Sequence, residues 1–575
     1  MAAPKHGIAM HGEPALSAGF THLPYVNPKA PKGGILKQAV TGSFDSTNPF
    51  IVRGQAASGV RTLVFESLLG RNSAEPFSLY GLLAETIDVN EDFSTIAFKL
   101  RNGAKFSDGR AVTSADVAYS LELLRERGRP NFRNYYSKVT RVETPDAHTI
   151  IYHQEGADRE LPLILGLMPV LPKHVWSDKD FESTTLEPLV GSGPYVMAEI
   201  SAGDRVSYRR DRGYWGKDLA ISKGLWNFDE VRFDYYRDNN ASFEAFKKGL
   251  ADLRLESDPS RWSTGYDFPA AKNGAVILTT IEQHSPSAAS GFAFNTRRTI
   301  FADPRVREAL VLCFDFEWAN KNLFHDLYRR TQGYYPNSDL SYAGKPASEI
   351  ELALLGDAKS GIAEAILDGT YRTPVSDGTG HDRKLLRKAV ALLAGAGWEI
   401  RGTQLVNRES GMPFAFTLSI VDRAQEKIAL HYQRTLQKIG VAMTIRVVDA
   451  TEFQRLQQSY EYDMVPATWH NSLSPGNEQQ FYFGSSGRTT EGTRNYPGIA
   501  DPAVDRLIEA LLRASSRNDL VAAVRALDRL LVNGHYIVPF YNSGGQWLAR
   551  AKHIGLPDRR PLQGFDATTA WFAGL

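Results

Sequence analysis

The spacing Gly191-x-Gly193 is this chain's nearest approach to a nucleotide-binding loop, in which glycine backbone N–H groups cradle a phosphate. The third glycine of that pattern is replaced by Val196. Pro194 also lacks the backbone N–H that would donate to a phosphate. We therefore predict that Gly191–Tyr195 is a tight turn leading into a strand, with no bound nucleotide.

Spacings typical of catalytic and metal sites are absent from the rest of the sequence. There is no Gly-x-Ser-x-Gly elbow, Ser-x-x-Lys pair, phosphate loop or His-Glu-x-x-His pair. His6 and His11 are too few ligands for a metal site. The single cysteine, Cys313, is predicted to lie within a helix that begins at Asp303-Pro304, and we expect it to be a small buried hydrophobe. We therefore expect a protein that is not an enzyme and holds no metal or cofactor.

Bulk composition excludes several classes of partner. The 575 residues carry 66 basic and 65 acidic side chains, for a formal net charge of +1. Such a balance provides no electrostatic footprint for nucleic acid or for an anionic membrane surface. The longest apolar run, Leu161–Leu171, is too short to span a membrane and contains two prolines.

The segment Lys99–Glu122 predicts a strand end, a tight turn at Phe106–Gly109 and a helix. Thr113 is a suitable N-cap with an aspartate three residues later, and Gly128-x-Pro130 is expected to stop the helix. Arg141–His153 predicts a hairpin that turns at Pro145-Asp146.

The second half of the chain predicts a βαβ unit. Its elements are a strand at 414–421, a helix at 424–439 that stops at Gly440, and a returning parallel strand at 441–448. Two further helices are expected, one over Asp382–Ala396 and one beginning at Asp501-Pro502. The fold class is therefore mixed α/β.

A series of short segments in this sequence resembles, in the right order, those of the family 5 (peptide/nickel type) solute-binding proteins of ABC importers. The segment Lys99–Glu122 is similar to the signature of that family. The collinear segments are Lys32–Leu36, Asp45–Phe50, Val64–Leu69, Lys99–Glu122, Gly191–Tyr195, Tyr208–Trp215, Ala245–Asp252, Phe294–Thr296, Phe301–Leu310, Asp463–Trp469 and Val538–Tyr541. The segments Phe20–Gly34, Ser474–Gln479 and Gly492–Asp501 further resemble the Yej-type subgroup, which is associated with oligopeptides and microcin C.

The resemblance implies a two-lobed periplasmic-binding-protein fold of the large, three-domain cluster C type, with a hinge and a ligand cleft between the lobes. We expect residues 1–290 to form the first lobe, including an inserted subdomain at about 50–190. Residues 291–541 would form the second lobe, and residues 542–575 would return to the first.

The resemblance also implies where a peptide amine would bind. In similar proteins an aspartate follows a cleft tryptophan and holds the amine. Trp469 is the matching tryptophan here, but His470-Asn471-Ser472 follows it and supplies no aspartate. Glu478 or Asp45 would then substitute, or the amine is held differently. Phe44, beside Asp45, is a further expected contact.

The anionic end of a peptide requires a cation, because a buried unpaired charge costs several kcal/mol. Arg329 and Arg330, with Thr331, are the first candidates, since the corresponding loop faces the cleft in similar proteins. Arg488 and Arg494, in a polar loop, are the second candidates. Arginine suits this task because its planar fork binds a carboxylate through two hydrogen bonds.

The function implied is capture of oligopeptides, including cell-wall-derived or microcin C-like peptides, and delivery to the permease of an ABC importer. We expect a periplasmic monomer, given as a mature form without its signal peptide. The alternatives are a periplasmic sensor or chaperone-like binder, or a binder of opines or oligosaccharides.

Overall fold

The described part of this computed structural model comprises residues 4–156, 158–421 and 423–574. Its backbone separates into two compact units. Unit 1 consists of residues 1–257, 265–281 and 546–575, and unit 2 consists of residues 258–264 and 282–545. The lobe boundaries expected from the resemblance, at 290/291 and 541/542, stay predictions. Met1–Ala3 lies outside the described residues.

The predicted strand–turn–helix is confirmed in unit 1. Strand β6 (Thr95–Leu100) leads to helix α2 (Ser114–Arg127), which begins at the N-cap Thr113. The backbone N–H of Thr113 donates to the Asp116 carboxylate (2.9 Å), completing a capping box. Gly128 ends the helix as expected. Pro130 was expected only to stop it, but it occupies the first turn of helix α3 (Pro130–Tyr136), where its missing N–H is tolerated.

The predicted hairpin exists, but the expected position of its turn was wrong. Strands β7 (Val139–Asp146) and β8 (Thr149–Gln154) are joined by Ala147-His148. Pro145 stays within β7, where the register shifts between Glu143 and Asp146. The Asp146 carboxylate accepts hydrogen bonds from the His148 N–H (2.7 Å) and the Thr149 hydroxyl (2.9 Å), which places the reversal after it.

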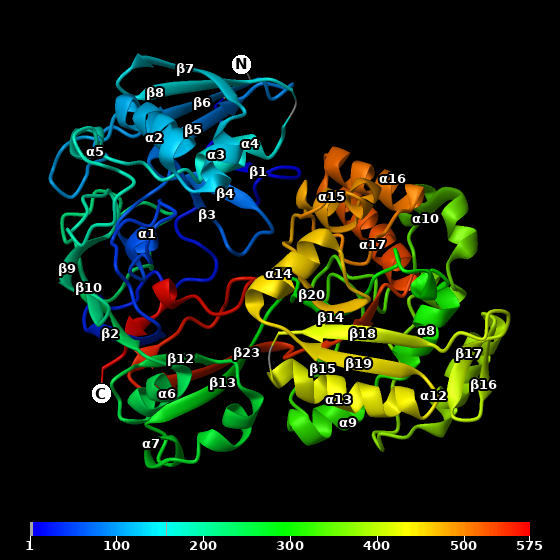
Figure 1. Cartoon of the computed structure of the whole chain (residues 1–575). Coiled ribbons are helices and arrows are strands. Elements are labelled where there is room, and N and C mark those ends of the chain that lie inside the picture. Colours follow the sequence, from blue (N-terminus) through cyan, green and yellow to red (C-terminus); the bar gives the residue numbers. More distant parts are fainter. Residues whose placement is uncertain (1–3, 157, 422, 575) are drawn as a thin grey trace. The chain divides into compact units, whose positions relative to one another are not determined.

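Unit 1 contains a mixed sheet of seven described strands, most of which are labelled in Figure 1. In spatial order its strands are β13 (Val276–Glu282), β23 (Gly545–Ala551), β12 (Leu253–Glu256), β2 (Ile35–Thr41), β11 (Glu230–Tyr236), β10 (Arg205–Arg210) and β9 (Tyr195–Ser201). Strand β9 follows the turn Gly191–Tyr195 as predicted. The first strand matched to the family, Lys32–Leu36, lies at the start of β2.

Smaller sheets and short helices complete the described part of unit 1. The other strands are β1 (Gly7–Ala9), β4 (Ser78–Gly81) and β3 (Leu69–Arg71) in one sheet, β5 (Ala84–Val89) beside β6, β8 and β7 in another, and the pair β24 (Ile554–Gly555) and β25 (Trp571–Phe572). The other helices are α1 (Val60–Leu63), α4 (Leu161–Gly166), α5 (Lys173–Trp176), α6 (Asn239–Lys247) and α7 (Pro269–Lys272).

Unit 2 is organised around a sheet of five described strands. Their order is β19 (Ala442–Val447), β18 (Ala415–Ile420), β20 (Met464–Trp469), β14 (Ala289–Phe294) and β21 (Ile537–Pro539). The predicted βαβ unit is confirmed, because β18 and β19 are parallel and helix α13 (Arg423–Gln437) connects them. Two short pairs accompany this sheet: β15 (Arg329–Arg330) with β22 (Tyr541–Asn542), and β16 (Trp398–Arg401) with β17 (Gln404–Asn407).

The other helices of unit 2 are α8 (Pro304–Leu312), α9 (Phe316–Leu323), α10 (Glu349–Leu355), α11 (Glu364–Leu367), α12 (Arg383–Gly395), α14 (Ala450–Ser459), α15 (Glu478–Phe483), α16 (Pro502–Arg513) and α17 (Arg517–Asn533). Alternation along β14 separates two large hydrophobic cores of this unit. Ala289 and Ala293 pack into one core with α16 and α17, while Phe292 and Phe294 pack into the other with α8, α12 and α13. The expected caps Asp303, Asp382 and Asp501 are confirmed for α8, α12 and α16.

Cys313 is confirmed as a buried residue at the end of α8. It is 1% exposed, and its thiol donates to the Ala309 carbonyl (3.3 Å). Burial raises the pKa of this thiol to about 12. A thiol held in its neutral form is a poor nucleophile, which agrees with the structural role expected for it.

Candidate functional site

Most of the predicted binding residues gather at one edge of the five-stranded sheet of unit 2. Strand β14 is antiparallel to β20 and to β21, with Ala289 opposite Trp469 and Gly291 opposite Pro539. The beginning of β14 therefore lies beside the ends of β20 and β21. We call this edge the rim; its residues are Ser287, Arg329, Thr331, Asn337, Trp469–Ser472, Glu478 and Asn542.

Within the rim, Trp469 is the residue whose side chain packs into the hydrophobic core. Its side chain is fully buried and lies 5.7 Å from the Tyr334 ring and 5.8 Å from both Phe483 and Tyr496. The indole N–H donates to the Arg494 carbonyl (3.0 Å). These partners surround the Trp469 ring in this structure. Stacking of the ring on a ligand therefore stays a prediction from the resemblance.

The segment after Trp469 alternates between exposed and buried side chains. His470 and Ser472 are exposed, whereas Asn471 is 8% exposed and donates to the Tyr334 carbonyl (2.9 Å). The Asn471 side-chain oxygen accepts from Gln479 (3.0 Å). Asn471 therefore fixes the loop, and its two neighbours face solvent.

Glu478 is half-buried, and donors from two neighbouring residues use part of its carboxylate. Both carboxylate oxygens accept from the Gly476 N–H (3.1 Å), and one also accepts from Gln479 (3.0 Å). A carboxylate offers about four acceptor positions, so capacity remains for another donor. Gln479, which the sequence did not single out, also accepts from the Tyr335 hydroxyl (2.7 Å) and is fully buried.

The neighbouring arginines Arg329 and Arg330 have opposite environments. Arg330 is 7% exposed, and it donates to the carbonyls of Pro539 (3.0 Å) and Phe314 (3.2 Å). Its guanidinium also lies 4.9 Å from the Phe314 ring centre. Burial lowers the pKa of Arg330 to about 10. Arg329 is exposed, and its side chain pairs with no carboxylate of the described residues. Arg329 is thus the cation at the rim that stays available.

A cluster of neutral polar side chains that the sequence analysis missed lies beside Arg329. Asn337 donates to the Ser287 hydroxyl (2.6 Å) and to the Asn542 side-chain oxygen (3.0 Å). Asn542 lies opposite Arg329 in the β15–β22 pair, and its amide nitrogen is 3.4 Å from the Thr331 hydroxyl. Asn337 has φ 63°, a left-handed conformation that asparagine tolerates, so the Pro-Asn-Ser sequence was a local signal for this turn.

The second pair of predicted arginines also divides into two roles. Arg488 donates to the Gly498 carbonyl and to the carbonyl of Thr296 (3.2 Å), so it holds backbone segments together. Arg494 is exposed, and its guanidinium lies 5.9 Å from the Tyr482 ring centre without an ion pair among the described residues. Arg494 therefore adds a second free cation close to Trp469.

Phe44 and Asp45 belong to unit 1. Phe44 is 2% exposed and packs 4.9 Å from the Tyr235 ring centre. Asp45 is exposed, and one of its carboxylate oxygens accepts from the Gln55 N–H (2.6 Å). The other oxygen has no hydrogen-bond donor within the part of the chain that the structure describes. Asp45 therefore retains a free acceptor oxygen, while Phe44 is buried and packs against Tyr235.

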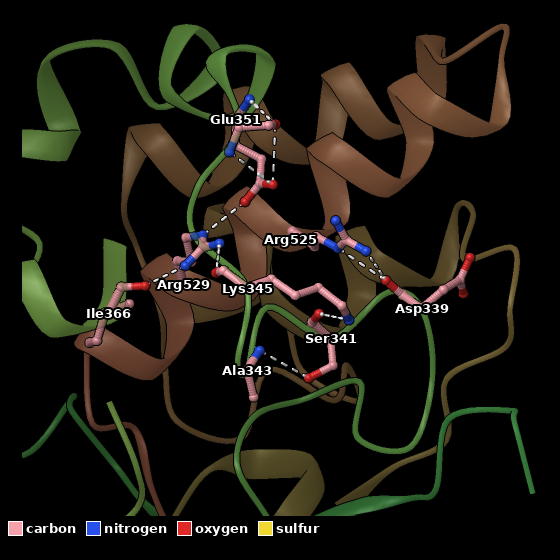
Figure 2. Close-up of polar contacts among 9 residues, drawn as sticks. Asp339, Ser341, Ala343, Lys345, Glu351, Ile366, Arg525 and Arg529 are labelled. Atoms are coloured by element: carbon pink, nitrogen blue, oxygen red, sulfur yellow. Dashed lines mark hydrogen bonds and ion pairs between the residues drawn. The ribbon is translucent and has the colours of Figure 1, made fainter. Parts of the chain in front are cut away.

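Helix α17 anchors the loop that follows Trp469. Arg517 donates to the Leu473 carbonyl and to both oxygens of Asp339 (2.8 Å), and Arg525 donates to the Asp339 carbonyl (2.7 Å). Figure 2 shows the next turn of α17, where Arg529 pairs with Glu351 (2.8 Å) and donates to two backbone carbonyls. Three arginines of one helix thus hold the chain segments at Leu473, Asp339 and Lys345.

The groups at the rim are suited to recognition through hydrogen bonds and ion pairs. Carboxamides, hydroxyls and the Arg329 guanidinium are present there, and Arg494 adds a guanidinium close to Trp469. These groups donate and accept hydrogen bonds or pair with anions. Within the described residues no cluster of three or more His, Cys, Asp or Glu side chains could hold a metal ion. None of the helices in the described ranges is long and apolar enough to cross a membrane.

Comparison with known proteins assigns the chain to a family. The model of bacterial extracellular solute-binding proteins, family 5, matches residues 78–491. The chain is 45% identical over 589 residues to the peptidoglycan-binding protein YepA of Agrobacterium fabrum, covering 100% of this chain and 96% of that protein. It is 36% identical over 580 residues to "Probable peptide-binding protein YejA" of the same organism, covering 99% and 94%.

Solved structures agree on the fold. The oligopeptide-binding protein AppA from Bacillus subtilis, solved with a nonapeptide, superposes with a TM-score of 0.64 at 18% identity, covering 95% of this chain and 100% of that one. At this identity the likeness concerns the fold alone, and it confirms the predicted α/β binding-protein class. The family model and the two full-length relatives together show that this chain belongs to the bacterial extracellular solute-binding proteins of family 5.

Proposed function

We propose that this protein binds peptides in the periplasm and delivers them to the permease of an ABC importer. The observation that carries the proposal is the composition of the rim, where free Arg329 lies beside the carboxamides of Asn337 and Asn542. Peptide groups are themselves amides, which both donate and accept hydrogen bonds, and a peptide ends in a carboxylate that a guanidinium binds through two hydrogen bonds.

The ligand class that fits best is a short peptide released from the cell wall. Such peptides carry more than one carboxylate, and two cations lack ion pairs among the described residues: Arg329 at the rim and Arg494, whose backbone carbonyl contacts Trp469. The name of the relative YepA, a peptidoglycan-binding protein, supports the same class. Asp45 and Glu478 are proposed partners of the peptide amine, because each keeps acceptor capacity.

Membership of a family of extracellular solute-binding proteins supports the proposed cellular role. We propose a monomer that works outside the cytoplasmic membrane, captures a ligand without changing it, and docks on a membrane permease. A sensor that binds the same ligand without transport would lack only this last step. Uptake of a labelled cell-wall tripeptide in cells with and without the gene separates the two roles.

The first test is mass spectrometry of small molecules released when the protein, purified from its own organism, is denatured. Peptide masses that contain cell-wall amino acids are expected. Sugar or opine masses would keep the family and overturn the peptide assignment. If no cargo is released, calorimetry with a cell-wall tripeptide decides, and absence of saturable binding at millimolar peptide would contradict the proposal.

A further inference from the structure

Unit 1 contains a cavity of about 210 Å³ on one face of its seven-stranded sheet. Its floor is formed by β2 and β11, which are parallel, with Leu36 opposite Val231 and Gln38 opposite Phe233. Residues two apart on a strand share a face, so these four side chains project to the same side. The floor is apolar except for the carboxamide of Gln38.

The wall on the side of helix α1 is fixed by close packing. A Cβ added at Gly59 would lie 2.7 Å from the Phe233 ring, so the chain passes directly over that ring. The adjacent Ser58 is held by the Tyr235 and Tyr208 hydroxyls, which contact its N–H (2.7 Å) and its carbonyl (2.6 Å). This wall of the cavity is therefore preformed, as ligand pockets usually are.

The opposite wall contains a strained aromatic residue. Trp226 lines the cavity and has φ 52°, and its backbone N–H donates to the Thr568 carbonyl (2.8 Å). A bulky side chain in the left-handed region is uncommon and persists only where the surroundings enforce it. Such strain gathers at ligand-binding positions, and here the residue contributes an aromatic ring to the lining of the cavity.

The lining restricts the chemistry of an occupant. None of the residues that line the cavity is Asp, Glu, Lys, Arg or His. A charged ligand would lose its hydration without gaining a partner, which is strongly unfavourable. The carboxamide of Gln38 makes no hydrogen bond within the described residues, although it offers both donors and an acceptor. Trp226, Phe228 and Phe233 offer aromatic surface.

The geometry points to a second, small-molecule site in unit 1, for an uncharged planar aromatic compound that carries an amide or lactam group. The ring would lie between Trp226 and Phe233, and its amide would pair with the Gln38 carboxamide. An apolar cavity of about 150 Å³ is enough to hold benzene, so the present volume accommodates a fused two-ring molecule. This site shares no residue with the proposed peptide contacts, and the inference does not depend on the proposed function.

The test uses 2-quinolinone, a neutral two-ring lactam, as the probe, with calorimetry on the full-length protein. Saturable binding with a one-to-one stoichiometry is expected. Gln38→Leu keeps the volume but removes the amide, so we expect at least fivefold weaker binding. Thr62→Trp places a large ring at the exposed mouth of the cavity and should abolish binding.

The matched control is Gln404→Leu, an exposed glutamine of unit 2, which should bind the probe as the unchanged protein does. Circular dichroism and the thermal midpoint verify that each variant is folded. The proposal is overturned if 2-quinolinone shows no saturable binding up to its solubility limit. It is equally overturned if folded Gln38→Leu and Thr62→Trp both bind the probe like the unchanged protein.

Discussion

At the scale of single residues, Arg329 and Arg330 show how a shift of one position along a strand changes what a side chain does. Successive residues of a strand point to opposite sides. Arg330 therefore enters the core and satisfies two carbonyls, while Arg329 stays exposed. The same residue type thus supports the fold at one position and offers a free charge at the next.

Replacing each arginine by glutamine should separate affinity from stability. Arg329→Gln is expected to weaken binding of a free tripeptide about tenfold, since hydrogen bonds to charged groups contribute about 1.5–3 kcal/mol. Binding of the same peptide with an amidated C-terminus should change less than twofold. Calorimetry measures both, and Arg506→Gln, at an exposed site on α16, is the matched control.

Arg330→Gln should instead lower the free energy of unfolding by about 2 kcal/mol, because it leaves buried carbonyls without donors. Urea denaturation measures this change. An unchanged urea midpoint for Arg330→Gln, together with weakened peptide binding, would reverse the roles assigned to the two residues.

Glu66 should make stability depend on pH. Burial raises the pKa of this carboxyl to about 8, and the Tyr214 hydroxyl donates to one of its oxygens. Between pH 4.5 and 8 the folded protein keeps a proton that the unfolded chain releases, so the free energy of unfolding falls as pH rises through this window. A shift of this size corresponds to at most about 5 kcal/mol.

Glu66→Gln keeps the acceptor for Tyr214 but cannot ionise, so it should lose less stability than the unchanged protein between pH 5 and pH 8. Urea midpoints at the two pH values test this. Glu409→Gln, at an exposed position, should follow the unchanged protein. Parallel pH curves for Glu66→Gln and the unchanged protein would contradict the raised pKa.

At the scale of elements, a buried ion pair joins α10 to α17. Arg529 and Glu351 are 0% and 1% exposed, and Glu351 also takes part in the capping box of α10 (Figure 2). Removing one partner leaves a charge buried without compensation, whereas removing both leaves an apolar contact. The pair therefore contributes little net stability, and its main role is to fix which segments lie together.

Arg529→Met is expected to lower the free energy of unfolding by about 3–5 kcal/mol, and Glu351→Leu combined with Arg529→Met should recover at least half of that loss. Chemical denaturation of the single and double variants gives both numbers. Arg513→Met, which breaks the exposed pair with Glu509, should cost less than about 1 kcal/mol. Additive losses in the double variant would refute this account of the pair.

At the scale of the whole molecule, ligand binding should be visible as stabilisation. A ligand that binds only the folded state adds about 2.7 kcal/mol when its concentration is 100 times its Kd. A cell-wall tripeptide should therefore raise the thermal midpoint by a few degrees, with a logarithmic dependence on concentration. Scanning calorimetry with the tripeptide and with a neutral disaccharide compares the two ligand classes. A shift only with the disaccharide would overturn the peptide assignment.

Much of the fold was predictable because its signals are local. The caps Asp303, Asp382 and Asp501 act within one helical turn, and the βαβ unit ends its helix beside Gly440. The hairpin turn lies after Asp146 and not at the predicted Pro145-Asp146, because a register shift lets proline, a residue typical of turns, remain in the strand. Local chemistry alone does not reveal such a shift.

The family, the α/β class and the positions of many helix ends can be predicted from the sequence, since these depend on residue type and short spacing. Which side chains are available to a ligand becomes visible in the folded chain alone. Trp469 is enclosed by Tyr334, Phe483 and Tyr496, and Asn337 meets Ser287 and Asn542, partners up to 205 residues apart. The reason is physical: burial and hydrogen bonding at the rim depend on contacts between distant segments, and no short window of sequence contains both partners.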